Sequence, residues 1–161
     1  MDLNEQIVME WLEEVKDPEI PVISLIDLGV ITEISIEEGN KVRVEMTPTF
    51  AGCPAIDYMK KDVEKTLAAK GLDDFEVNVS FKSQWSSNNI STKGKAALKN
   101  FGLAPPPHIT AVVDLNILEH TPCPFCDSTD TELKSPFGPT LCRALHYCHH
   151  CHQAFEQFKP I

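Results

Sequence analysis

Four cysteines in the C-terminal part of the chain have the spacing of a metal site. They form two C-x2-C pairs, Cys123 with Cys126 and Cys148 with Cys151, and 21 residues separate the pairs. Each pair can offer two thiolates from one tight turn, and two such turns can close a tetrahedron around Zn²⁺. We therefore predict a structural zinc site that contributes folding energy and performs no chemistry. Iron in the same four-sulfur site is the alternative, because the spacing does not distinguish the two metals.

One further cysteine and several histidines lie close to these pairs in the sequence: Cys142, His146, His149, His150 and His152. Four cysteines already complete a tetrahedral site, so we expect the histidines to surround the site or to be exposed. Cys142 is expected to be a small buried apolar residue, and a role as an extra metal ligand is the alternative.

The sixth cysteine, Cys53, lies far from the others and directly precedes Pro54. Proline is favoured in the first turn of a helix, so Cys53 is expected at the helix N-cap or beside it. Backbone N–H groups and the positive end of the helix dipole would there favour the thiolate, which attacks electrophiles or binds metal. The alternative is that Cys53 is only a small residue at a helix start.

A single thiolate at Cys53 cannot hold a metal centre alone, so a second ligand is needed. Asp17 and Glu19, in a proline-containing loop, are the candidates, and a second copy of the chain is another source. Thr47 and Thr49 add hydroxyl groups near the same cysteine loop. These residues are therefore the candidates for a labile metal site around Cys53.

The elements that position these residues are predicted from hydrophobic periodicity. The N-terminal part reads as a helix in 3–15, strands in 30–37 and 41–47, a helix from 56 that stops before Gly71, a strand in 75–81 and a helix in 91–100. In the first strand, Val30, Thr32, Ile34 and Ile36 are expected to share one face. The order α-β-β-α-β-α predicts a two-layer α+β domain.

The C-terminal part is poor in helix signals. A proline-rich linker with a possible strand spans 104–117, and further candidate strands lie near 110–118, 131–134, 143–148 and 154–159. So short a segment needs a staple such as zinc to fold. We therefore predict an α+β domain in 1–103, the linker in 104–117 and a small zinc-ribbon-like β domain in 118–161.

Composition restricts the class of protein further. The net charge is −10, from 24 acidic and 14 basic residues, which disfavours binding to nucleic acid phosphates. The N-terminus has no signal-peptide pattern, and no apolar run has the roughly 18 residues of a membrane span. We expect a cytoplasmic protein without membrane contact, in which six cysteines serve metal or thiol chemistry rather than disulfides.

Two N-terminal segments carry a resemblance to a known family. "DPEIPVISLIDLGVI" and "MTPTFAGCPA" closely resemble the iron–sulfur assembly domain family, which includes iron–sulfur targeting and maturation factors. In that family the DPE segment and the cysteine of a T-x-x-x-x-CP loop form the characteristic site. The residues that match these motifs are Asp17, Pro18, Glu19, Thr47, Thr49, Cys53 and Pro54. The resemblance implies an α+β fold.

The rest of the chain resembles a narrower family, the D subunits of phenylacetyl-CoA epoxidase systems. The matching segments are "QWSSNNISTKGKAALKNFGLAPP", "CPFC", "FGPTLCRALHYCHHC" and "FEQFK", and Cys142 belongs to this tail pattern. The chain departs from the family by lacking a proline before Phe155 and by having "SSNN" after Trp85 in place of a more acidic and aromatic stretch.

This resemblance implies an accessory protein that is not itself an enzyme. It would mature an iron–sulfur or diiron centre of the epoxidase in phenylacetate degradation, with the reductase or the diiron subunit as partner. The implied cofactors are Zn²⁺, or iron, at the four cysteines and a transient iron or iron–sulfur cluster at Cys53. An electron-carrying or structural component of the oxygenase complex is the alternative function, and a homodimer is the alternative assembly.

Overall fold

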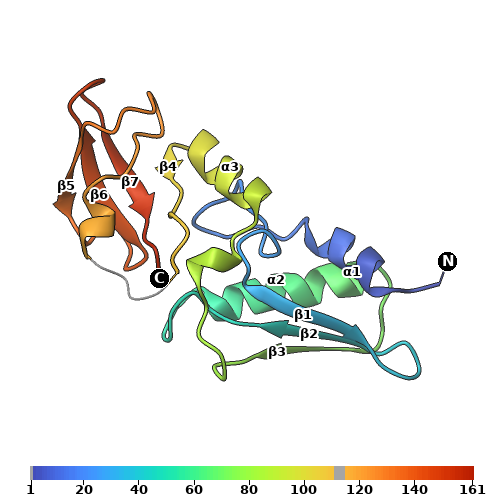
Figure 1. Cartoon of the computed structure of the whole chain (residues 1–161). Coiled ribbons are helices and arrows are strands. Elements are labelled where there is room, and N and C mark those ends of the chain that lie inside the picture. Colours follow the sequence, from blue (N-terminus) through green and yellow to red (C-terminus); the bar gives the residue numbers. More distant parts are fainter. Residues whose placement is uncertain (1, 111–114) are drawn as a thin grey trace. The chain divides into compact units, whose positions relative to one another are not determined.

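The computed structural model describes residues 2–110 and 115–161. Contacts divide the chain into two compact units, Met1–Trp85 and Ser86–Ile161, which are described separately below (Figure 1). The predicted boundary lies near residue 103, whereas helix α3 (Thr92–Asn100) and strand β4 (Leu103–Ala104) belong to the second unit. The predicted boundaries therefore stay a proposal about which segments fold by themselves.

The first unit is a three-stranded sheet packed against two helices. Its elements are α1 (Glu5–Leu12), β1 (Ile31–Ile36), β2 (Val42–Met46), α2 (Ile56–Ala69) and β3 (Phe75–Val79). The sheet order is β1-β2-β3, with β1 and β2 antiparallel and β2 and β3 parallel. Helix α2 makes the crossover between the two parallel strands and contacts both α1 and β3. The predicted α+β class and the element order along the chain are thus confirmed, although the last helix of that order, α3, belongs to the second unit.

Side-chain periodicity explains the packing of this unit. Met59, Val63 and Leu67 of α2 are buried on one face, and Val42, Val44 and Met46 alternate into the core along β2. The alternation predicted for β1 is wrong at its start, where Ile31 is buried and Thr32 is exposed. The pairing of β1 with β2 shifts between Ile31 and Glu33, and such a bulge reverses the face on which the next side chains lie.

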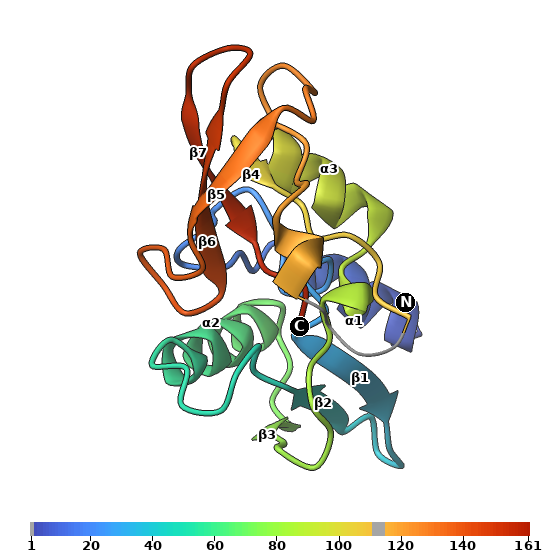
Figure 2. The ribbon, with the colours of Figure 1, turned by 60° about the vertical axis from the view of Figure 1, so that its left-hand side comes forward.

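The second unit contains a four-stranded sheet in the order β4-β7-β6-β5. Its other strands are β5 (Thr131–Ser135), β6 (Arg143–Cys148) and β7 (Ala154–Phe158), and its short 3-10 helices are η1 (Ser87–Asn89) and η2 (Leu115–Leu118). Strands β5, β6 and β7 form an antiparallel meander, while β4 pairs with β7 in parallel (Figures 1 and 2). Helix α3 contacts β4.

The strands predicted near 131–134, 143–148 and 154–159 are confirmed as β5, β6 and β7. The possible strand in 110–118 is not found where the structure describes this segment, because 115–118 is the 3-10 helix η2. Residues 111–114 of that prediction lie outside the described residues.

Candidate functional site

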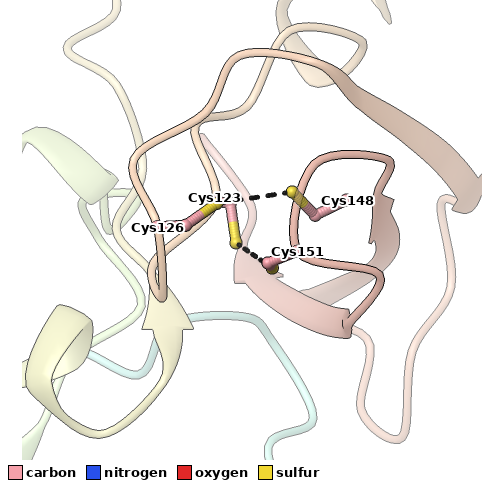
Figure 3. Close-up of side chains that lie close together, drawn as sticks. All are labelled: Cys123, Cys126, Cys148 and Cys151. Carbon is pink, nitrogen blue, oxygen red and sulfur yellow. Dashed lines mark hydrogen bonds between the residues drawn. The ribbon is translucent and has the colours of Figure 1, made fainter.

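The four cysteines of the two C-x2-C pairs meet at one end of the second sheet. Cys123 and Cys126 lie in the loop between η2 and β5, Cys148 ends β6, and Cys151 lies in the turn before β7. The Sγ atoms of Cys123 and Cys151 are 3.7 Å apart, and those of Cys126 and Cys148 are 3.6 Å apart. Figure 3 shows the four side chains pointing toward one another. All four Sγ atoms lie within 4.8 Å of one another.

This geometry fits a tetrahedral metal ion. Four sulfurs at the Zn–S bond length of about 2.3 Å from a common centre would be about 3.8 Å from one another. The observed separations of 3.6 and 3.7 Å are close to that value. The donor set can hold zinc as a closed structural site, and ferrous or ferric iron accepts the same four thiolates.

Backbone N–H groups around the cysteines prepare the site for a cation. The N–H groups of Cys151 and His150 donate to the sulfur of Cys148 and lower the pKa of this thiol to about 6. The N–H group of Ser128 donates to Cys126, but burial and the neighbouring thiols together raise the pKa of Cys126 to about 12. In the absence of a cation one thiol therefore ionises readily, and a metal is needed to hold all four sulfurs as thiolates.

The histidines near the cysteines have different environments. His149, His150 and His152 are exposed, as expected for residues around a completed site, and His149 Nε2 lies 3.2 Å from Glu132 Oε2. His146 is fully buried instead. Its ring stacks on Phe155, with 5.2 Å between the ring centroids, and burial lowers its pKa. His146 is therefore a neutral part of the ribbon core.

The partner of His146 was not foreseen from the sequence. His146 Nε2 lies 3.0 Å from Gln157 Oε1, and the exposed fraction of Gln157 is only 1%. Antiparallel pairing of β6 with β7 places these residues on the same face of the sheet, since Ala144 is opposite Gln157 and His146 is opposite Phe155. The alternation of β7 could have indicated that Gln157 lies inside, but only the pairing register identifies its partner.

Cys142 lies outside the four-cysteine group among the residues that the structure describes. It is buried, and its Sγ lies 3.1 Å from the hydroxyl oxygen of Thr140. Cys142 thus has the environment of a small buried residue.

The loop that carries Cys53 connects β2 to α2 in the first unit. The N-cap of α2 is Ala55. Cys53, which was predicted at the N-cap or beside it, lies two residues before the cap, so the N-cap position is corrected. Residues 53–56 form a tight turn, in which the carbonyl oxygen of Cys53 accepts a hydrogen bond from the Ile56 N–H group at 3.3 Å. Pro54 is accommodated in this turn rather than in the first helical turn.

The two threonines of this loop follow β2. Thr47 is buried, and its N–H group donates to the carbonyl oxygen of Val30 at 2.8 Å, which continues the pairing of the strands. Thr49 is half-buried. The hydrogen bond between Thr47 and Val30 therefore fixes the position at which the cysteine loop begins.

Asp17, which is proposed above as a second metal ligand beside Cys53, fixes the conformation of its own loop. Its Oδ1 atom accepts hydrogen bonds from the N–H groups of Glu19 and Ile20, both at 2.8 Å. This arrangement fixes the turn and engages one of the two carboxylate oxygens. Glu19 is exposed.

A cleft of about 610 Å³ lies beside this acidic loop. Asp17 lines it together with Tyr58 and Lys65 of α2, while Cys53 is not among its lining residues. The structure therefore places Asp17 in the wall of a cleft that α2 also lines, and a metal shared by Asp17 and Cys53 stays a proposal.

Within residues 2–110 and 115–161, none of the helices combines the length and apolar character needed to span a bilayer.

The two parts of the chain match two families. Residues 5–81 match the family described as "Iron-sulfur cluster assembly protein", and residues 112–159 match the family described as "PaaD zinc beta ribbon domain". Among solved structures, a domain of unknown function from Bacillus anthracis is 32% identical with a TM-score of 0.55, covering 58% of this chain and 90% of its own. The fold and the cysteine cluster thus define an iron–sulfur assembly domain joined to a zinc ribbon.

Similar proteins narrow this class. A protein of Escherichia coli (strain K12), named as the D subunit of a 1,2-phenylacetyl-CoA epoxidase, is 30% identical over 93% of this chain and 89% of its own length. An Fe-S protein maturation auxiliary factor of Porphyromonas gingivalis is 33% identical over 59% of this chain and 90% of its own length. The chain belongs to the family of phenylacetyl-CoA epoxidase D subunits.

Proposed function

We propose that this protein is a non-catalytic accessory factor that matures an iron–sulfur or diiron centre of a phenylacetyl-CoA epoxidase system. The observation that carries the proposal is the combination of two similarities in one chain. Similarity to an epoxidase D subunit extends over 93% of the chain, and similarity to Fe-S protein maturation auxiliary factors extends over 59% and 56% of it. The clients would be the reductase or the diiron subunit of the same system, in the cytoplasm.

In this proposal the two units have different roles. Cys53, with Asp17 or Glu19 from this chain or with a second copy of it, takes up iron or a cluster transiently. The turn that Asp17 fixes leaves its second carboxylate oxygen available for a metal, because both backbone hydrogen bonds use Oδ1. Thr47 and Thr49 hold the cysteine loop, and the four-cysteine ribbon, with its metal, gives the second unit a rigid surface for docking.

The test is the metal content of the clients. We expect that the epoxidase components, produced together under iron-replete conditions, contain several-fold less iron and labile sulfide when this protein is omitted. Their protein yield should stay unchanged, because the factor acts on the metal centre. Equal cluster content with and without the protein would contradict a maturation role.

An electron-carrying role is the second candidate, since the four-sulfur geometry of Cys123, Cys126, Cys148 and Cys151 also suits iron. We expect the anaerobically purified protein to be colourless and to contain about one zinc per chain. A coloured protein with one iron per chain and a reversible reduction would favour the electron carrier and displace the maturation proposal.

A further inference from the structure

The second unit contains a cavity that none of the preceding roles uses. Its volume is about 590 Å³, within the range of roughly 300–1,000 Å³ typical of small-molecule sites. It is bounded by the segment after β4, by η2, and by the loop that enters the first cysteine pair, so that Cys123 forms part of its wall. The lining is mainly apolar, and a few polar side chains reach it.

Prolines form most of the apolar wall. Pro105, Pro106 and Pro107 line one part of the cavity, and Pro122 and Pro124 line another. Proline has a fixed φ angle and no flexible side chain, so this wall exists before a ligand binds and little conformational entropy is lost on binding. Proline rings present flat C–H faces, and these pack well on aromatic rings, as in the recognition of proline-rich segments by aromatic grooves.

A buried polar side chain indicates which chemical group a ligand of this cavity should carry. Gln157 lines the cavity although only 1% of its surface is exposed, and its Oε1 atom lies 3.0 Å from His146 Nε2. If the imidazole donates to this oxygen, the amide nitrogen is the group that Gln157 offers to a ligand, and an amide nitrogen only donates. A ligand with a carbonyl acceptor would match it.

The charged residues of the cavity do not favour a strongly ionic ligand. Lys99 and Asp127 both line it and form an ion pair with each other. Their charges offset each other, so the ligand that fits this lining is neutral.

We propose that this cavity binds a neutral aromatic ring that bears a nearby carbonyl acceptor. The ring packs on the proline wall, and the carbonyl oxygen accepts a hydrogen bond from the amide of Gln157. An aromatic residue of a partner protein and a free aromatic amide share this chemistry. The site is independent of Cys53 and of the proposed maturation role.

The test uses the full chain, labelled with ¹⁵N and with ¹³C in isoleucine methyl groups. It is titrated separately with N-acetyl-phenylalanine methylamide, with benzamide and with N-acetyl-alanine methylamide. We expect both aromatic probes to shift the signals of Ile117, Thr121 and the Gln157 side-chain amide with a Kd on the order of millimolar. The alanine probe should bind at least tenfold more weakly. Absence of saturable shifts at these residues, or an equal response to the alanine probe, would overturn the proposal.

Two variants test the location of binding. Ile117→Trp fills the cavity from η2, and Pro107→Trp places a large side chain at an exposed lining position. Each should weaken aromatic binding at least tenfold while the amide spectrum stays dispersed. If Ile117→Trp does not fold, Pro107→Trp decides the result. Phe137→Ala, which removes an exposed aromatic ring outside the cavity, is the control and should bind the probes as the parent does.

The two aromatic probes also distinguish the source of the ligand. Tighter binding of the phenylalanine derivative indicates an aromatic residue of a partner protein, because its backbone amides add contacts. Tighter binding of benzamide indicates a free small molecule. Unchanged affinity in both tryptophan variants would show that the ring binds elsewhere and would refute the assignment.

Discussion

Replacing Cys148 by serine is expected to abolish stoichiometric metal binding and to unfold the second unit. Structural zinc contributes an apparent free energy of roughly 10–16 kcal/mol to the folding of zinc-finger peptides. The free energy of unfolding of a whole domain is only about 5–15 kcal/mol. The core around the site is small, with Ala104 and Phe155 packed against the cysteines, so burial alone cannot replace the metal. Metal analysis and the amide spectrum of the full chain measure the two effects.

The control for this prediction is Cys142→Ser. Cys142 is buried beside the hydroxyl group of Thr140 and lies outside the group of four cysteines in the described part of the chain. The Cys142→Ser protein should retain one metal per chain and a dispersed amide spectrum, with at most a modest loss of stability. Residues of the first unit should keep their signals in Cys148→Ser, because their core is formed within Met1–Trp85. A fully metallated and folded Cys148→Ser protein would refute the structural role of the site.

Replacing Cys53 by serine is expected to reduce the iron and labile sulfide incorporated into the epoxidase clients several-fold, to the level found when the protein is omitted. Serine has nearly the same size, and its hydroxyl group is not deprotonated near neutral pH, so the change removes the soft thiolate ligand and leaves the turn intact. Cys53 is neither a cap of α2 nor one of the four clustered cysteines, so stability and zinc content should be unchanged. Client cluster content and the melting temperature of the variant are measured together.

A pair of substitutions at Asp17 identifies the second ligand. Asp17→Asn keeps an oxygen that can accept from the N–H groups of Glu19 and Ile20, and it removes the negative charge. Asp17→Ala removes both. If Asp17 binds metal, both variants impair client maturation; if it only fixes the turn, only Asp17→Ala does so. Normal maturation by Cys53→Ser would remove the thiolate from the proposal altogether.

Local patterns in the sequence predicted most elements within a few residues of their bounds. The apolar stripe of α2 and the alternation of β2 were correct, because periodicity reports which side chains one element can bury together. The face assigned to Thr32 was wrong, because a bulge depends on how β1 pairs with β2, and that pairing is not encoded in either strand alone. The predicted start of α2 at residue 56 was correct, but Cys53 lies two residues before the N-cap rather than at it, because Pro54 fits a tight turn as well as a first helical turn.

The chemistry of the tail could be predicted from residue types and spacing alone. Each C-x2-C pair needs only one short turn to present two sulfurs, so two such pairs in one chain predict a four-sulfur metal site. Other features required the folded chain. The parallel pairing of β4 with β7, the contact of His146 with Gln157, and the proline-walled cavity each join segments that are distant in sequence. Such contacts depend on strand register and on the burial available after the sheet has formed, and no periodicity within one segment records them.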